Sequence, residues 1–187
     1  MLARPGHSTW VITLWQLEPG RNIPPYINGR KKGSNPFEEL NMETLADIVK
    51  NYNPIVCVED IVDYIKKKNP RWFKSSWETL GVIPLNNAGY PLGIEKVSEG
   101  NEDSCSCGFR KMFKLMFSKR KYYTATYFVV VHNHPSGNTE PSLKDIKLTR
   151  DIIGAGKLLE FPLVDHIIIS PLGSYYSTCR VHPDWFE

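Results

Sequence analysis

The chain has 187 residues, 41% of them hydrophobic, and a formal net charge of +3. A chain of this length can bury one hydrophobic core and still carry an extension. The weak net charge does not by itself indicate a nucleic-acid partner. No apolar run approaches the roughly 18 residues of a membrane-spanning helix, and Ser8–Leu14 is too short and too polar for a signal peptide. We therefore expect a cytoplasmic protein without a membrane partner.

The N-terminal part, residues 1–55, is predicted to be an extension of uncertain fold that precedes the main domain at 56–187. Within it, Thr9–Trp15 is a candidate strand and Pro19–Pro36 has the composition of a loop. Met42–Asn51 has a helical pattern. A further helix is predicted at Val58–Lys68, where three lysines at the C-terminal end complement the helix dipole.

An amphipathic helix is predicted in the middle of the chain, with its apolar stripe on a sheet. The apolar residues at helical spacing are Phe109, Met112, Phe113, Met116 and Phe117. The basic residues that crowd the same region are Arg110, Lys111, Lys114, Lys119, Arg120 and Lys121. A solvated face is favoured over a phosphate-binding patch.

Two histidines close a predicted buried strand. The run Tyr127–Val131 is aromatic and β-branched, as is typical of strands. His132 and His134 follow it, and residues two apart on a strand face the same way. Both imidazoles are therefore expected to leave one face at the end of the strand.

A carboxylate is expected to face these histidines from the start of a helix. Pro135–Asn138 has the composition of a turn. After it, Pro141 and Ser142 open a helical pattern, in which Leu143, Ile146, Ile153 and other apolar residues share one side and Asp145 lies in the first turn. Two imidazoles and a carboxylate suit Zn²⁺ with a fourth position left open for catalysis.

Simpler explanations exist for each of these residues taken alone. Ser142 and Asp145 fit the S/T-x-x-D/E capping pattern, which would explain both of them without a metal. Two histidines at this spacing are more often only a polar strand end. The metal interpretation depends on the joint pattern, H-x-H-x(7)-S-x(2)-D.

That joint pattern resembles the signature of the JAMM metalloproteases. The longer run from Val129 to Ser170, with its HNHPSG core, its PS-x-x-D, AGKLL and DHIII, is similar to the bacterial RadC family. The resemblance covers residues of about 76 to 180. It implies a JAB domain of the α/β (α+β) class, a mixed, curved β-sheet flanked by helices, with a zinc site at the edge of the sheet.

The resemblance also implies a glutamate base upstream of the histidines. The stretch from Trp77 to Asn87 is similar to the family's glutamate, apolar strand and asparagine turn, which gives this role to Glu78. Glu95 lies in a second strand-like stretch and fits less well. Glu99 and Glu102, in the polar connection after that stretch, also fit less well.

The implied reaction is hydrolysis of a peptide or isopeptide bond. His132, His134 and Asp145 would hold Zn²⁺, which lowers the pKa of a bound water from about 15.7 toward about 7. Glu78 would take the proton of that water and pass it to the leaving amine. The hydroxyl of Ser142 would donate to the developing oxyanion. The substrate is expected to be a protein or peptide of unknown identity.

The chain departs from the RadC pattern in two places, and the repair association of the RadC family leaves a second function open. Residues 1–70 show no helix-hairpin-helix segment, which many RadC proteins use to bind DNA. The segment Lys119–Tyr123 makes the connection before the histidine strand about four residues longer than is usual in the family. The alternative is a DNA-repair-associated protein whose JAB domain is a binding module, and a nucleic-acid partner has weak support. The oligomeric state is not predicted.

Overall fold

The computed structural model describes residues 50–100, 108–119 and 122–187. The strand expected at Thr9–Trp15 and the loop expected at Pro19–Pro36 lie outside these residues. Most of the helix expected at Met42–Asn51 also lies outside them, and its last two residues are helical. No helix in the described part of the chain is long and apolar enough to cross a membrane.

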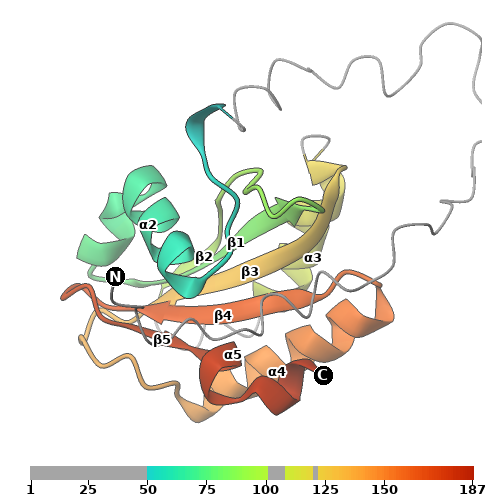
Figure 1. Cartoon of the computed structure of the whole chain (residues 1–187). Coiled ribbons are helices and arrows are strands. Elements are labelled where there is room, and N and C mark those ends of the chain that lie inside the picture. The colour runs from blue at the N-terminus through green and yellow to red at the C-terminus, as the bar shows by residue number, and fades with distance from the viewer. Residues whose placement is uncertain (1–49, 101–107, 120–121) are drawn as a thin grey trace, which may run out of the picture. The chain divides into compact units, whose positions relative to one another are not determined.

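Five strands form one mixed sheet in the order β2-β1-β3-β4-β5 (Figure 1). Strands β1 and β3 are antiparallel, as are β1 and β2, and β4 and β5, whereas β3 and β4 are parallel. The predicted mixed α/β architecture is therefore confirmed. The strand bounds are β1 Glu78–Asn86, β2 Glu95–Gly100, β3 Ala125–Asn133, β4 Leu163–Ile169 and β5 Tyr175–Ser177.

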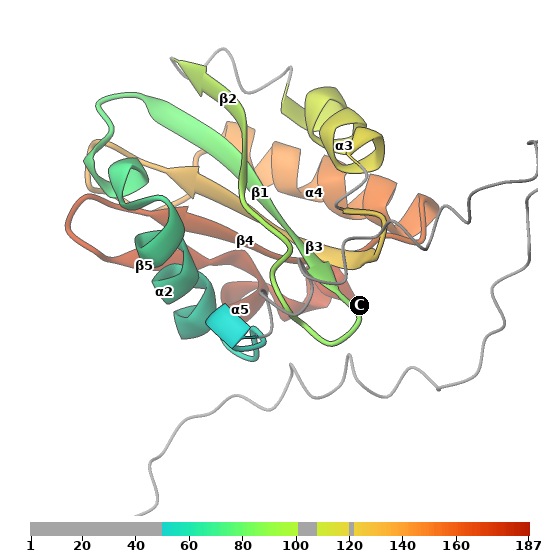
Figure 2. The same ribbon diagram turned by 90° about the horizontal axis from the view of Figure 1, so that it is seen from above.

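Helices cover both faces of this sheet (Figure 2). Helices α3 and α4 lie on one face, where their apolar side chains share a core with β1 and β3. On the other face, η2 places the indole of Trp72 where a side chain on Gly81 of β1 would stand. The bounds are α2 Val58–Lys68, η2 Pro70–Lys74, α3 Gly108–Ser118, α4 Leu143–Leu158, α5 Thr178–Val181 and η5 Pro183–Phe186.

The central strand β3 extends the strand predicted at Tyr127–Val131 by two residues at each end. It lies between β1 and β4, so residues 128–133 are buried on both faces. Helix α4 connects β3 to the parallel strand β4. Such a crossover brings the start of the helix to the end of the first strand. The loop 134–142 and the first turn of α4 therefore lie beside the end of β3.

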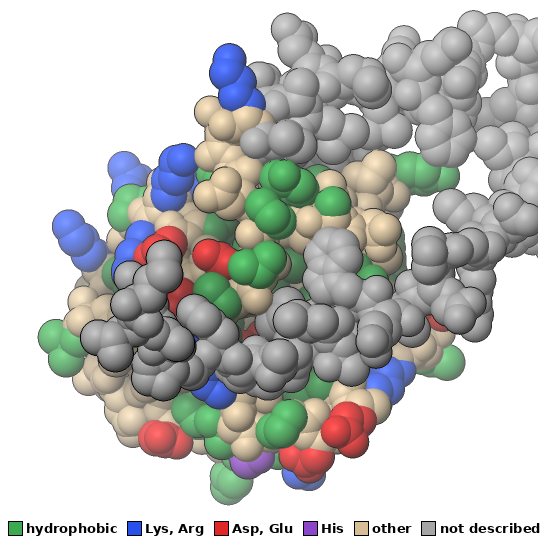
Figure 3. Space-filling model, viewed as in Figure 1, with side chains coloured by type: hydrophobic (Ala, Val, Ile, Leu, Met, Phe, Trp, Pro, Cys, Tyr) green, Lys and Arg blue, Asp and Glu red, His purple; other side chains and the backbone are tan. Residues whose placement is uncertain are grey.

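The predicted amphipathic helix is α3. Its Met112, Phe113 and Met116 are buried against the sheet, whereas Arg110, Lys111 and Lys114 are exposed. Phe117, predicted on the same apolar stripe, is 59% exposed, so the prediction is wrong for this residue. The basic residues 120 and 121 lie outside the described ranges. On the molecular face drawn in Figure 3, acidic side chains lie among the basic ones. The core that α3 shares comprises Leu80, Val82, Val97, Met112, Phe113, Met116, Phe128, Val130, Leu148, Ile152, Ile153, Phe161 and Leu163.

Helix α4 starts where the sequence predicts, but the prediction for Leu143 is wrong. Ser142 caps the helix and Asp145 lies in its first turn. Ile153 is buried, whereas Leu143 is 85% exposed. Leu143 and Leu148 are five residues apart, which at 3.6 residues per turn places them on different sides of the helix. The buried face of the first turn is instead occupied by the carboxylate of Asp145.

A buried carboxyl holds the C-terminal segment on β4. Asp165 is fully buried, and it accepts hydrogen bonds from Ser177 Oγ and from the backbone N–H of Cys179 in α5. Burial raises the pKa of Asp165 from 3.8 to about 7. The folded protein therefore favours the neutral acid.

We expect Asp165 to make the free energy of unfolding fall as the pH rises. A raised pKa stabilises the folded state fully below the unfolded value, here about 4, and this stabilisation is lost as the pH passes about 7. At about 1.36 kcal/mol per pKa unit, the loss is roughly 4 kcal/mol. Denaturant unfolding at about pH 5 and about pH 8 should show about 3 kcal/mol of this loss, because the part below pH 5 lies outside that range. Asp165→Asn should lack this dependence, and an equal dependence in both proteins would contradict the assignment.

Candidate metal centre

The two histidines leave the end of β3 and are almost completely buried. His132 is 1% exposed and His134 is 8% exposed. His132 pairs with Leu80 of β1 and therefore faces the same side of the sheet as α3 and α4. His134 follows the strand, and its backbone N–H donates to the carbonyl of Ile169 in β4. The imidazole rings lie 4.8 Å apart, nearly perpendicular to each other.

The first turn of α4 is a complete capping box. Ser142 Oγ accepts from the backbone N–H of Asp145, and the Oδ2 of Asp145 accepts from the backbone N–H of Ser142 at 2.8 Å. Ser142 Oγ also donates to that Oδ2 at 2.7 Å. The simpler capping explanation is therefore correct for both residues. It does not exclude a second role, because the same carboxylate also faces the histidines.

Asp145 approaches both imidazoles. Its Oδ1 lies 3.0 Å from His132 Nδ1, and its Oδ2 lies 3.4 Å from His134 Nε2. Burial alone would raise the pKa of Asp145, but the two imidazoles hold it well below the usual range. Burial likewise lowers the pKa of His132, but Asp145 and Glu78 outweigh burial and raise it to about 9. The two carboxylates therefore favour a positive charge in the space between them and the imidazole rings.

The loop after β3 selects the tautomer of His134. The backbone carbonyl of Asn138 lies 2.8 Å from His134 Nδ1. A carbonyl can only accept, so Nδ1 carries the hydrogen and the lone pair of neutral His134 is on Nε2. The turn that returns Asn138 to the ring needs Gly137, whose φ is +88°. An N–H that donates to a carbonyl is the usual support of a metal-binding histidine.

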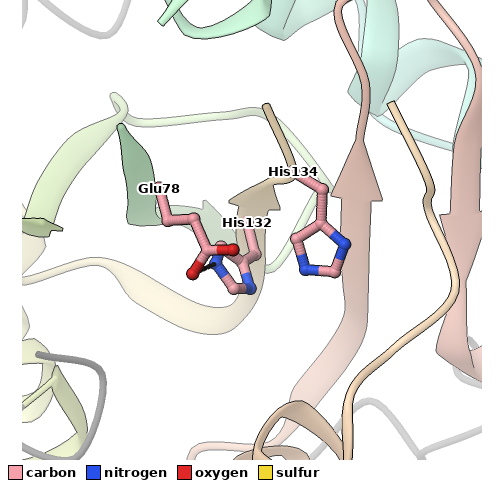
Figure 4. A group of neighbouring side chains, drawn as sticks. All are labelled: Glu78, His132 and His134. Atoms are coloured by element: carbon pink, nitrogen blue, oxygen red, sulfur yellow. Dashed lines mark ion pairs between the residues drawn. The ribbon is translucent and has the colours of Figure 1, made fainter. Parts of the chain in front are cut away.

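Glu78 completes the cluster from β1 (Figure 4). Its Oε2 lies 3.6 Å from His132 Nε2. Its side chain is 21% exposed, and the imidazole of His132 lowers its pKa. The predicted base thus lies beside the two histidines.

Two of the three glutamates that fit the role of base less well, Glu95 and Glu99, lie outside the cluster. Glu95 forms an ion pair with Lys119 and accepts a hydrogen bond from Tyr122. Glu99 lies in β2, where it is exposed and pairs with Lys96, so its expected place in the connection after the strand is wrong. Glu102 lies outside the described ranges.

The atoms of this cluster fit a metal ion. Both ring nitrogens of His132 are buried and lack a hydrogen-bond partner among the described residues, although carboxylate oxygens lie near them. Zinc bonds of about 2.0 to 2.2 Å at tetrahedral angles put neighbouring ligand atoms about 3.3 Å apart. The three nitrogen–oxygen distances are 3.0, 3.4 and 3.6 Å. A cation bound to one nitrogen of His132 would use the lone pair of the ring, and the other nitrogen, which then carries a hydrogen, would still face a carboxylate.

Two sets of ligands share the histidines. Ligand atoms of Glu78, His132 and His134 all lie within 4.8 Å of one another, which makes these residues a candidate metal-binding group. The sequence pattern instead predicts Asp145 as the third ligand, and Asp145 is the nearer carboxylate to both rings. In the first set Glu78 is a metal ligand. In the second set Asp145 is the ligand and Glu78 is the base.

The comparison with known families agrees with this geometry. A family model described as the RadC-like JAB domain matches residues 55–182. The chain belongs to the RadC family. JAB domains include metallopeptidases, and the cluster at the end of β3 lies within the matched residues of this RadC chain.

The RadC chain is similar to several curated relatives that are named only as UPF0758 proteins. It is 37% identical over 100 residues to one from Porphyromonas gingivalis, covering 54% of the chain and 42% of the relative. It is 44% identical over 108 residues to one from Thermosynechococcus vestitus, covering 58% and 41%. For one from Clostridium tetani, identity is 36% over 120 residues, covering 64% and 49%. The chain thus spans less than half of the length of each of these relatives.

Sequence reasoning missed a buried layer beneath the cluster of the RadC chain. Thr149 Oγ1 donates to the backbone carbonyl of Asp145 at 2.7 Å and lies 2.6 Å from His166 Nδ1. The hydroxyl hydrogen is used by that carbonyl, so Thr149 accepts from His166. The ring of His166 stacks on His132 at 6.3 Å, and burial lowers its pKa to about 3. A neutral imidazole therefore packs against His132. In the sequence, this layer is indicated only by the DHIII segment, which contains His166.

A cavity of about 310 Å³ opens onto the cluster. All five predicted site residues line it, Glu78, His132, His134, Ser142 and Asp145, together with the loop before α4. Lys144 and Glu140 add one charge of each sign to the lining. A substrate in this cavity would reach the metal-binding atoms directly.

Proposed function

We propose that this RadC chain is a zinc-dependent metallopeptidase that hydrolyses a peptide or isopeptide bond. The observation that carries the proposal is the environment of His132. Its ring nitrogens are buried and have no hydrogen-bond partner in the part of the chain that the structure describes, and each faces a carboxylate. Buried polar atoms of this kind are rare unless an ion or a proton satisfies them. The cavity at this point gives a substrate access.

In this proposal His132, His134 and Asp145 hold the zinc, and Glu78 acts as the base. Zinc supplies a lowered pKa for a bound water and polarises the scissile carbonyl. Glu78 accepts the proton of the water and delivers it to the leaving amine. Its low pKa, caused by His132, keeps it ionised and able to accept at neutral pH. His132 lies between Glu78 and Asp145, so one of its nitrogens could bind the zinc while the other faces a carboxylate.

Ser142 would donate to the oxyanion only after a rotation. Its one hydroxyl hydrogen is given to Asp145 Oδ2 in the structure. If the hydroxyl turns toward a substrate, Asp145 keeps the hydrogen bond from the backbone N–H of Ser142. The carboxylate therefore stays oriented while the hydroxyl is released. Ser142 lines the cavity, so the rotation needs no movement of the backbone.

The metal content of the purified protein tests the proposal. We expect about one zinc per chain by elemental analysis, since structural and catalytic zinc sites hold one ion tightly. His134→Ala should lose it, because the ring is positioned by Asn138 for metal binding and belongs to both candidate sets of ligands. Lys147→Ala, which removes an exposed lysine paired with Asp151 on α4, is the control and should keep it. A wild-type protein that binds no zinc after reconstitution would refute the proposal.

The substrate can be sought with a protein that binds but does not cleave. Glu78→Gln is expected to retain its protein or peptide substrate in the cavity, because the change keeps the size of the side chain and removes the base. Proteins recovered with Glu78→Gln but absent from the His134→Ala sample are the candidates. Cleavage of a candidate by the wild-type protein, and its loss with a chelator, would identify the scissile bond.

A further inference from the structure

Asn133, the residue between the two histidines, bridges β3 to the start of β1. Its Oδ1 accepts from the backbone N–H of Thr79 at 2.6 Å, and its Nδ2 donates to the backbone carbonyl of Trp77 at 3.1 Å. These two backbone groups lie on either side of Glu78 in the sequence. Asn133 is 1% exposed, and its hydrogen bond with Thr79 is buried, whereas the one with Trp77 is partly buried.

The bridge forms where the backbone of β3 leaves β1, at the start of a strand that β2 pairs on its other edge. The register pairs Thr79 with Asn133, and the next residue, His134, gives its N–H to Ile169 of β4. The sheet bonds between β1 and β3 therefore end beside Glu78. Beyond this point the side-chain amide of Asn133 links β3 to β1 in place of the backbone. Its oxygen accepts from one backbone group of β1, and its nitrogen donates to another.

The side chain of Asn133 is on the opposite face of the sheet from the metal cluster. Side chains alternate along a strand, and His132 faces α3 and α4 with Leu80. Asn133 therefore contacts neither the cavity nor the histidine rings, and does not line the pocket. It acts on Glu78 only through the backbone of residues 77–79.

We propose that Asn133 is a positioning residue that fixes Glu78 relative to His132 and His134. This inference rests on the proposed function, in which Glu78 acts on a metal-bound water. The three residues H-N-H then have two tasks. The outer two hold the metal from one face, and the middle one ties the base to the same strand from the other face. An apolar side chain in place of the amide removes the acceptor of the Thr79 N–H, while the Trp77 carbonyl keeps only its hydrogen bond from Ser75 Oγ among those of the described residues. The start of β1 is then expected to shift.

The test uses Co²⁺ in place of zinc, so that no substrate is needed. The visible absorption of the cobalt protein, followed against pH, reports the groups next to the metal. Glu78→Gln should displace the midpoint of this transition from its wild-type value. Asn133→Leu should displace it in the same direction while still binding about one Co²⁺ per chain. Val131→Ala, which opens a cavity in the same strand without touching the bridge, should leave the midpoint unchanged.

The double variant decides whether Asn133 works through Glu78. If it does, Glu78→Gln combined with Asn133→Leu moves the midpoint no further than Glu78→Gln alone. An additive shift would overturn the inference, as would a wild-type midpoint in Asn133→Leu. Loss of cobalt from Asn133→Leu alone would also overturn it, since the bridge would then support the ligands. If Asn133→Leu does not fold, Asn133→Ser is measured in its place, because serine is too short to span both backbone groups.

These results separate the inference from the function on which it rests. A wild-type protein that binds no Co²⁺ refutes the metal centre and the inference together. A wild-type protein that binds Co²⁺, with a midpoint that Glu78→Gln displaces and Asn133→Leu does not, refutes only the inference.

Discussion

Replacing Glu78 by glutamine is expected to reduce cleavage by about 10²- to 10⁴-fold, the usual contribution of a general base, and to leave the metal in place. The amide has the size of the carboxylate but cannot accept the proton. The cavity, which the side chain of Glu78 lines, should therefore keep its shape. Turnover of a substrate found with the trap, measured beside zinc content by elemental analysis, checks both parts.

The same variant separates the two sets of ligands. If Glu78 is a ligand, as its grouping with His132 and His134 allows, Glu78→Gln should lose zinc as well as activity. Retained zinc with lost cleavage supports Asp145 as the third ligand. A Glu78→Gln protein that still cleaves at the wild-type rate would remove the base assignment. Glu99→Gln, an exposed glutamate on β2, is the matched control and should behave as the wild type.

Replacing Asp145 by alanine is expected to remove the metal and to destabilise α4. Loss of an outer partner of a ligand already weakens metal binding by about 10- to 100-fold, and Asp145 contacts both histidines directly. Loss of the capping interaction adds about 0.5 to 2 kcal/mol in the free energy of unfolding. Zinc stoichiometry and denaturant unfolding of the metal-free protein measure the two effects separately.

Ser142→Ala is the control that removes the cap but keeps the carboxylate. It should lower the free energy of unfolding by a similar amount, because Ser142 Oγ accepts from the N–H of Asp145. It should also keep about one zinc per chain. If Asp145→Ala binds zinc as well as Ser142→Ala does, then Asp145 only caps the helix and the proposed ligand set is wrong.

Local patterns predicted the elements that carry the cluster. The β-branched run before His132 became β3, the apolar stripe became α3, and Val58–Lys68 became α2 with the predicted bounds. Patterns succeed here because burial of one face of a helix or strand makes apolar residues recur at a regular spacing along the sequence. The same reasoning failed for Leu143, since the buried side of the first turn of α4 belongs to Asp145, a polar residue that a hydrophobic pattern does not reveal.

The sequence by itself determined the chemistry of the cluster: two imidazoles after a strand, a capped carboxylate after a turn, and the family to which their spacing belongs. Only the tertiary structure decided which residues from distant parts of the chain lie beside this cluster. It brought Glu78 of β1 to His132, placed neutral His166 beneath that ring, and directed the amide of Asn133 to the backbone around Glu78. The reason is that such contacts depend on strand order and register, which are set by the packing of the whole sheet and leave no periodic signal near any one residue.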